Sequence, residues 1–488
     1  MKRVLCIAIL VLMTAYGTAW AGGFVRHDLT VDGKIHQVVA VDVNGDDAKD
    51  LLIAYAKNDR RRAAARIAVV MAGDGFAAPR LDIALPADAC LWDTADVNGD
   101  GIAELIVLRK WSVVSRPLAK TEAATWTTLA KQGTGVLFPP DDGAVGTMDF
   151  ARDWTGDGTW EIVVPDYGAL VFLRADGASF KRAFTVTLPV DGWMRVESDP
   201  GQAASGERIV AGLELPQIFT VPTGRGHELF LVKDEAVTRH ALTEQGVFAK
   251  QGKTQRFEFL TEQERQAGNM SVISRTDDLN GDGYPDLMLN KIGGGLSTFR
   301  SAVRVYAGTP TGFAETPAFS FESDGFASMV HFRDLDGDGN KEMYLPYADF
   351  GLAQLVRMLT TKKVKLKAQI YRGAAGLYAD KPTLSRSATF HVTTERGMDF
   401  RGYPPNFNGD FDGDGLNDLL MESGDGFGVY RNEGGLKFGG TSMMQYNLSP
   451  REHLLLADVN ADGKSDCILW DTFDPAQRGQ VVVLVNEQ

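Results

Sequence analysis

Seven short stretches of the chain place oxygen-bearing side chains at every second position. DLNGDGYPDL, which begins at Asp278, has Asp, Asn and Asp at its first, third and fifth positions, Gly at its sixth and Asp at its ninth. Calcium takes six to eight oxygen ligands, and carboxylates that alternate along one turn can point inward together around a single ion. The backbone carbonyl of Tyr284, at the seventh position, would add a further oxygen. The pattern therefore predicts a calcium loop.

Copies of this loop begin at Asp42, Asp96, Asp153, Asp278, Asp334, Asp410 and Asp458. Up to seven calcium ions are predicted. The predicted ligands are the first, third, fifth and ninth residues of each copy: Asp42, Asn44, Asp46 and Asp50; Asp96, Asn98, Asp100 and Glu104; Asp153, Thr155, Asp157 and Glu161; Asp278, Asn280, Asp282 and Asp286; Asp334, Asp336, Asp338 and Glu342; Asp410, Asp412, Asp414 and Asp418; Asp458, Asn460, Asp462 and Asp466.

The copies are not equivalent. The first has Asp47 at the position of the sixth-place glycine, and the third has Thr155 at its third position, so both are expected to bind more weakly. The loops from Asp334 and Asp410 carry four acids and are expected to bind best, because ligand charge helps to set affinity. A plain hairpin turn is the competing interpretation, since Asn-Gly and Asp-Gly form turns by themselves. A turn does not require acids at positions one, five and nine.

The formal charge of the chain is consistent with bound cations. The full sequence carries −14, and removal of an N-terminal segment that contains Lys2 and Arg3 gives −16. Seven divalent ions would add +14 and leave about −2, so the acidity is interpreted as metal-site charge and not as a face aimed at a basic partner.

Short β-prone segments flank each loop. HQVVAV precedes the first loop and LLIAY follows it, and the segments after the loops are apolar at consecutive positions, as in strands covered on both faces. Four antiparallel strands per repeat, with the loop between the first and second, form a blade, and radially stacked blades form a β-propeller. The sequence therefore predicts an all-β propeller.

The spacing of the loops sets the number of blades. Successive loops start 54, 57, 125, 56, 76 and 48 residues apart, so a degenerate copy without metal ligands is placed at residues 193–213. Eight blades of about 58 residues are favoured, and seven of about 67 remain open if that segment is an insertion. The strand at residues 24–31 is expected to complete the last blade and close the ring.

Residues 1–21 have the pattern of a signal peptide, with a basic start, an apolar core and a small-x-small site ending at Ala21. The alternative is an uncleaved anchor, but the core is shorter than the roughly 20 residues that a membrane-spanning helix needs. Residues 22–488 are expected to form one exported propeller domain. Cys90 and Cys467 lie in apolar segments, where buried free thiols are favoured over a disulfide.

The D-x-[ND]-x-D-G-x-x-[DE]-L repeats resemble the FG-GAP and VCBS-type calcium repeats, which form the propeller of integrin alpha subunits and of many secreted bacterial proteins. The flanking Phe-Gly and Gly-Ala-Pro elements do not recur here, so the VCBS-type branch is closer. In that family the calcium ions are structural, and the resemblance implies the same role for the residues named above.

The ligand surface is expected on the face opposite the calcium loops. Insertions are placed on that face at about residues 244–270, 346–366 and 384–405. In the second insertion, Leu352, Leu355, Val356 and Leu359 have the spacing of an amphipathic helix. Positive charge follows at Lys362, Lys363, Lys365 and Lys367. The matching loop of the first repeat is expected to carry Arg60, Arg61 and Arg62. A basic surface suited to an acidic glycan or an anionic partner is one interpretation. The other is solvated loop charges and a helix that caps the sheet.

Two function classes remain open. The first is a binding or adhesion module for a glycan or protein, with no nucleic-acid partner and no transmembrane segment. The second is a polysaccharide lyase, because some secreted rhamnogalacturonan lyases are eight-bladed calcium propellers of similar build. No catalytic constellation is visible in the sequence, which favours binding. A Tyr, His and Arg cluster in a deep cleft opposite the loops would favour the enzyme.

Overall fold

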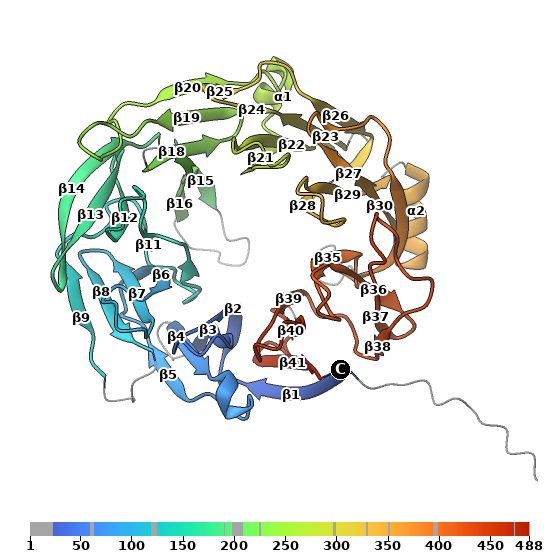
Figure 1. Cartoon of the computed structure of the whole chain (residues 1–488), viewed down its shortest axis with the longest axis horizontal. Coiled ribbons are helices and arrows are strands. Elements are labelled where there is room, and N and C mark those ends of the chain that lie inside the picture. Colours follow the sequence, from blue (N-terminus) through green and yellow to red (C-terminus); the bar gives the residue numbers. More distant parts are fainter. Residues whose placement is uncertain are drawn as a thin grey trace, which may run out of the picture.

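The apolar segment after each loop forms the second strand of a four-stranded antiparallel sheet, and eight such sheets surround a central axis (Figure 1). This computed structural model describes residues 23–58, 63–118, 124–189, 191–197, 208–223, 226–295, 299–327, 330–349, 352–393, 399–472 and 474–487. The predicted signal peptide at residues 1–21 and the arginines Arg60, Arg61 and Arg62 lie outside these ranges. The predicted eight-bladed β-propeller is confirmed.

In each blade the first strand lies nearest the centre of the ring and the fourth lies at its edge (Figure 1). Blades 1 to 4 consist of β2 (Lys34–Val41), β3 (Asp50–Asn58), β4 (Ala63–Val70) and β5 (Leu81–Ala84); β6 (Ala89–Ala95), β7 (Glu104–Arg109), β8 (Val113–Pro117) and β9 (Thr127–Ala130); β11 (Ala151–Arg152), β12 (Glu161–Asp166), β13 (Ala169–Asp176) and β14 (Ser179–Thr187); and β17 (Gln217–Thr223), β18 (Gly226–Lys233), β19 (Ala236–His240) and β20 (Lys253–Arg256).

Blades 5 to 8 follow the same order. They consist of β21 (Met270–Asp277), β22 (Asp286–Gly293), β23 (Arg300–Tyr306) and β26 (Phe319–Ser323); β28 (His331–Arg333), β29 (Glu342–Asp349), β30 (Lys363–Tyr371) and β33 (Leu384–Thr393); β35 (Asn406–Gly409), β36 (Asp418–Ser423), β37 (Gly426–Tyr430) and β38 (Met444–Tyr446); and β39 (His453–Ala457), β40 (Asp466–Trp470), β41 (Gln480–Asn486) and β1 (Phe24–Thr30).

Short elements decorate this frame. β10 (Gly146–Thr147), β27 (Gly325–Ala327) and β34 (Asp399–Arg401) extend the sheets of blades 2 and 6, β24 (Gly308–Thr309) pairs with β25 (Gly312–Phe313), and β31 (Gly373–Ala374) pairs with β32 (Leu377–Tyr378). The helices are the 3-10 turn η1 (Ala72–Asp74), α1 (Glu262–Ala267) and α2 (Leu352–Thr361). No helix of the described residues is long and apolar enough to cross a membrane.

The N-terminal strand closes the ring. β1 pairs antiparallel with β41 along its whole length, from Phe24 opposite Asn486 to Thr30 opposite Gln480. Leu29 of β1 is 1% exposed and packs into the core between blades 8 and 1. The predicted closure is confirmed, and it covers two strand edges that would otherwise be open to pairing with another chain.

The cores lie between neighbouring blades. One core, for example, joins Leu52 and Ile67 of blade 1 to Trp92 and Leu105 of blade 2. Leu51, Leu52 and Ile53 are consecutive and each is 0% exposed, because successive side chains of a strand point to opposite faces and both faces are covered. Burial on both faces explains why the residues after each loop are apolar at consecutive positions. The buried Cys90 and Cys467 are free thiols.

The fourth blade differs from the sequence prediction. The segment 193–213, assigned there to the degenerate repeat, contributes to a separate two-stranded hairpin, β15 (Asp191–Glu197) with β16 (Arg208–Glu214). Blade 4 is instead built from β17 to β20, and Thr223 at the end of β17 pairs with Gly226 at the start of β18. Only two residues separate these strands, which leaves no room for a nine-residue loop, so the blade leaves no metal motif in the sequence.

The three predicted insertions are partly regular strand. Residues 244–270 include β20, the fourth strand of blade 4, and residues 384–405 include β33, the fourth strand of blade 6. Residues 346–366 do contain a helix, α2, between β29 and β30. Met358 of α2 is 2% exposed and packs on Val364 and Leu366 in the core of the sheet extension.

Outside that core, Val356 of α2 is 54% exposed. Lys362 is exposed before β30, and Lys363 and Lys365 alternate along the strand with the buried Val364 and Leu366. Lys367 lies over the ring of Tyr347 at 5.1 Å. The helix therefore covers one face of this extended sheet, and the lysines of β30 lie on its other face.

Candidate functional site

The seven predicted calcium loops all connect the first and second strands of a blade. In the loop from Asp410, the backbone N–H groups of Gly413 and Gly415 donate to the two carboxylate oxygens of Asp410 at 2.7 and 2.8 Å. The N–H of Leu416 donates to Asp414 at 3.0 Å. Each acid thus holds the backbone of its own turn, which is the geometry of an Asx turn.

The structure brings the first, third and fifth positions together in the two loops with an acid at each of them. The carboxylates of Asp334, Asp336 and Asp338 offer oxygens within 4.8 Å of one another, and so do those of Asp410, Asp412 and Asp414. Asn or Thr occupies the third position in the other five loops. Because exposed acids also gather without an ion, the metal assignment of all seven loops stays a prediction.

The ninth residue of each loop has a separate structural role. In all seven loops one of its carboxylate oxygens accepts the backbone N–H of the second residue at 2.7–3.2 Å. In five loops the other oxygen accepts an N–H beside the end of the third strand at 2.6–3.0 Å. These carboxylates fasten the loop to the blade, and each oxygen keeps a second lone pair for an ion.

Burial perturbs the ninth residues. It raises the pKa of Asp286 and Asp418 to about 6 and that of Glu342 and Asp466 to about 7. Loss of hydration disfavours the charged form of a carboxyl group, and the neighbouring loop acids add repulsion. A cation among these oxygens would offset both effects.

Two predicted ligand atoms point to a missing partner. Oδ1 of Asp278 and Oδ1 of Asp336 are buried and have no hydrogen-bond partner among the described residues. The Asp336 side chain is only 2% exposed. An unpaired buried carboxylate oxygen is costly, so the donor set of these loops fits the calcium ion that the sequence predicts.

Glycine or an equivalent left-handed residue is required at the fourth position of the loops. Gly413 has φ of 77° there, whereas the last loop has Ala461 with φ of 60°. Replacing Ala461 with Gly is expected to stabilise the protein by about 0.5–1 kcal/mol, because glycine adopts this conformation without a Cβ penalty. The measurement is thermal unfolding by circular dichroism. Gly413→Ala is the mirror-image control and is expected to destabilise, and a lower melting temperature for Ala461→Gly would contradict the argument.

The most exposed large apolar side chains lie on the opposite face, at blades 2 and 3. Trp111, Phe138 and Tyr167 are 76%, 68% and 88% exposed, and no other large hydrophobic side chain among the described residues exceeds 54%. Trp111 lies in the turn between β7 and β8, and Tyr167 lies in the turn between β12 and β13. Connections from second to third strands lie at the end of a blade opposite the calcium loops. We call these three residues the aromatic surface.

One connecting segment holds the aromatic surface together. A Cβ on Gly133 would lie 2.4 Å from Cα of Trp111, and one on Gly135 would lie 3.9 Å from the backbone nitrogen of Tyr167. Gly133 and Gly135 are two residues apart, a distance of at most about 7 Å. The turns that carry Trp111 and Tyr167 therefore both lie against this segment. Nζ of Lys110 lies 4.1 Å from the ring centroid of Phe138. These contacts fix where the turns that carry the rings lie.

A groove of about 180 Å³ adjoins the aromatic surface between blades 1 and 2. Its walls come from residues 63–65, 85–87, 89, 139, 140, 143 and 145, and Pro139 and Pro140 follow Phe138 directly. Sequence reasoning missed this region because single aromatic residues in turns carry no spacing pattern. The one available signal was their position in connections opposite the calcium loops.

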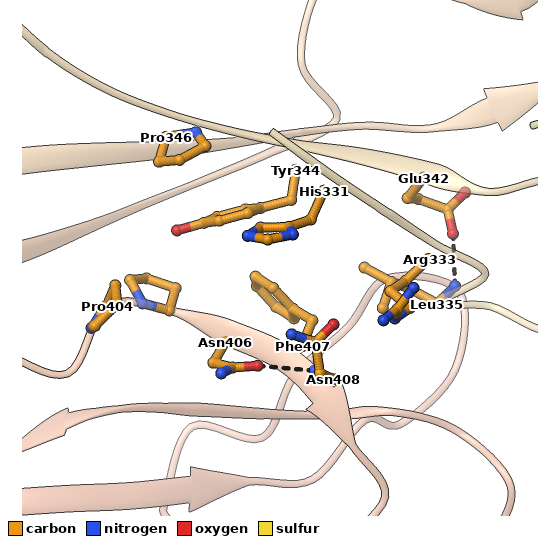
Figure 2. A pocket seen from close by; sticks show the side chains of 11 residues that line it. His331, Arg333, Leu335, Glu342, Tyr344, Pro346, Pro404, Asn406, Phe407 and Asn408 are labelled. Carbon is orange, nitrogen blue, oxygen red and sulfur yellow. Dashed lines mark hydrogen bonds between the residues drawn. The ribbon is translucent and has the colours of Figure 1, made fainter. Parts of the chain in front are cut away.

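A second pocket lies between the inner strands of blades 6 and 7, where residues of the two blades face each other (Figure 2). It brings together His331, Arg333 and Tyr344 with Phe407, and its volume is about 70 Å³. The ring of His331 stacks on Tyr344 at 6.3 Å, and the hydroxyl of Tyr344 is buried without a hydrogen-bond partner among the described residues. Burial and the nearby arginines Arg275 and Arg333 lower the pKa of His331 to about 4.

Residues 247–345 match the family model of the FG-GAP-like repeat. The chain therefore carries an FG-GAP-like repeat within an eight-bladed β-propeller. A search of curated proteins finds no match.

Solved structures with a similar course include a lectin from Agrocybe aegerita, described as specifically recognising non-reducing terminal N-acetylglucosamine. It is 13% identical, with 96% of each chain covered and a TM-score of 0.38. The Photorhabdus luminescens Tc holotoxin pore is 14% identical over 91% of this chain and 17% of that chain, with a TM-score of 0.30. Neither superposition is close enough to bear on what this chain binds.

Proposed function

We propose that this protein is an exported, calcium-stabilised binding propeller that recognises a glycan on the aromatic surface. Three large aromatic side chains exposed on one face carry this proposal, since aromatic residues are enriched at binding surfaces relative to the rest of a protein surface. The signal sequence supports export. The buried, unpaired oxygens of Asp278 and Asp336 support calcium in the loops.

A glycan suits this surface better than a flat protein partner. Trp111, Phe138 and Tyr167 come from three different connections, so the surface offers separate rings on which sugar rings can stack. The C–H face of a sugar ring is apolar and electropositive, so it stacks on the electron-rich face of an aromatic ring. The carboxylate of Asp166 and the amine of Lys131 lie in the same connections and offer polar groups to sugar hydroxyls.

A glycan microarray probed with the calcium-loaded protein tests the proposal. Removing one aromatic anchor from a binding site typically costs at least about 1–2 kcal/mol, so Trp111→Ala with Tyr167→Ala is expected to weaken binding by about a hundredfold. Ile273→Ala is the matched control, because Ile273 is 43% exposed on blade 5, away from this surface. Unchanged binding by the double variant would contradict the proposal.

A paired variant tests the basic surface that the sequence predicts. Lys363→Ala with Lys365→Ala alters the exposed lysines of β30 and is expected to leave glycan binding unchanged. If this lysine variant loses glycan binding while the Trp111→Ala, Tyr167→Ala variant still binds, the ligand site would lie at blade 6 instead.

A polysaccharide lyase is the second candidate, favoured by the meeting of His331, Arg333 and Tyr344 in one pocket. A neutral histidine can take a proton, and an arginine can face the carboxylate of a uronate. Two features oppose this assignment. The pocket of about 70 Å³ is well below the usual 300–1,000 Å³ of a ligand site, and a pKa of about 4 makes His331 a weak base.

Ultraviolet absorbance of acidic polysaccharides incubated with the protein decides between the candidates. A lyase leaves an unsaturated sugar that absorbs, and we expect no rise. A rise that disappears in His331→Ala would establish the enzyme.

A further inference from the structure

Three of the seven loops face an arginine from the third strand of their blade or the residue just after it. Glu161, the ninth residue of its loop, pairs directly with Arg174. Arg372 and Arg431 occupy the equivalent positions in blades 6 and 7. Each lies one residue beyond the last pair of the second and third strands, which is Met343–Tyr371 in blade 6 and Leu419–Tyr430 in blade 7. In the other four blades this position is occupied by Met71, Pro117, Ala307 and Val485.

The arginine occurs where the third loop residue is not asparagine. In the asparagine loops the amide of Asn44, Asn280 or Asn460 donates to the fifth-position aspartate at 2.8, 3.0 and 3.1 Å. In the fourth asparagine loop, the amide of Asn98 donates to the ninth residue at 2.6 Å. An ionised aspartate at the third position has no proton to donate. A different donor is then needed between the acids.

Arg372 and Arg431 supply that donor in the two four-acid loops. Arg431 lies 2.7 Å from Asp412 and 3.0 Å from Asp414. Arg372 lies 2.5 Å from Asp336 and 3.7 Å from Asp338. One guanidinium brings the formal charge of four acids from −4 to −3, which is the charge of the four ligand side chains in an asparagine loop. These loops are therefore not expected to exceed the others in affinity, contrary to the ranking from acid count alone.

In the third blade, Arg174 contacts more positions of its loop than Arg372 and Arg431 contact in theirs. Its guanidinium donates to Glu161 at 2.9 Å and to Thr155 at 3.3 Å, and it lies 3.1 Å from Asp157. It therefore contacts the third, fifth and ninth positions of one loop at once. Thr155 and Glu161 are 1% and 0% exposed, and the Thr155 hydroxyl donates to Glu161 at 3.1 Å.

The depth of the three arginines separates their roles. The Arg174 side chain is 28% exposed, whereas Arg372 and Arg431 are 53% and 55% exposed. The outer two lie at the rim, and the buried Oδ1 of Asp336 beneath Arg372 still has no hydrogen-bond partner among the described residues. The oxygens around Arg174 are already directed to a cation that belongs to the protein.

We propose that the guanidinium of Arg174 takes the place of the metal ion in the loop from Asp153, so that this chain binds six divalent cations instead of seven. Arg372 and Arg431 offset the extra acid of their loops without displacing the ion. This inference rests on the proposed calcium binding of the other loops.

Elemental analysis of the protein after equilibration with calcium and gel filtration tests the count. Six ions per wild-type chain are expected. Arg174→Met with Thr155→Asn gives the loop the ligand types of the loop from Asp96, and the methionine matches Met71 of blade 1; this variant is expected to bind seven ions. Arg239→Met removes an arginine of similar exposure that is paired with Glu228 in blade 4, and it is expected to leave six.

Two further variants locate the loop without an ion even if the double variant does not fold. Asp157→Asn is expected to leave six ions, whereas Asp100→Asn at the same position of the loop from Asp96 is expected to leave five. Seven ions in the wild type, or a loss of one ion on Asp157→Asn, would overturn the role of Arg174 alone. Absence of bound calcium from the wild type would overturn the calcium proposal and this inference together.

Discussion

Removal of divalent cations is expected to lower the melting temperature of the calcium-equilibrated protein by about 10 °C or more. An ion that binds only the folded state at one hundred times its dissociation constant stabilises that state by about 2.7 kcal/mol, and several sites act together. Without the ion, the folded state is also expected to be less stable because Asp278 and Asp336 each keep a buried oxygen without a hydrogen-bond partner among the described residues. Differential scanning calorimetry with calcium and with excess EDTA measures the effect.

Readdition of calcium above the EDTA concentration is the control, and it is expected to restore the original melting temperature. A chelator-insensitive melt would remove the claim that calcium holds the loops. Persistence of the folded ring at lower temperature in EDTA is expected, since the interblade cores and the β1–β41 pairing do not involve the ions.

Asp418→Ala is expected to destabilise the protein by about 2–6 kcal/mol even in EDTA. The two oxygens of Asp418 accept the backbone N–H groups of Phe411 and Asn432, each at 2.8 Å. Phe411 and Asn432 are each 1% exposed, and a buried donor left without an acceptor costs about 1–3 kcal/mol. The loss is large beside the 5–15 kcal/mol that stabilises a typical domain. Urea unfolding followed by tryptophan fluorescence measures it.

Asp414→Ala in the same loop is the matched control. Asp414 is 28% exposed and bonds mainly to its own turn and to Arg431. Its loss in EDTA is expected to cost under about 1 kcal/mol, as for other exposed ion pairs. If Asp418→Ala costs no more unfolding free energy in EDTA than Asp414→Ala, the hydrogen bonds of the ninth residue do not stabilise the blade by themselves, and this residue acts only through the ion.

Much of the ring was predictable from the sequence because its signals are local. A loop motif next to consecutive apolar residues marks the first and second strands of seven blades, and the unpaired strand at 24–31 implies the closure with β41. Blade 4 was misplaced because only two residues separate β17 from β18, which leaves no room for a loop motif. The hairpin β15–β16 lies just before that blade and has the apolar, turn, apolar order of a repeat.

The chemistry of the site was less accessible. The role of Arg174 depends on strand register, which pairs it with Glu161 thirteen positions earlier in the chain. The exposure of Trp111 and Tyr167 depends on which end of each blade a turn occupies and on what the neighbouring connection leaves uncovered. Neither property is a pattern of residue types along the sequence.

Hydrogen–deuterium exchange, with and without a glycan selected from the array, tests most directly whether ligand and calcium occupy opposite faces. On glycan binding, slower exchange is expected at residues 110–112, 135–139 and 166–168, with unchanged exchange in the seven loops. Protection confined to the loops, or to the pocket around His331, would contradict this expectation.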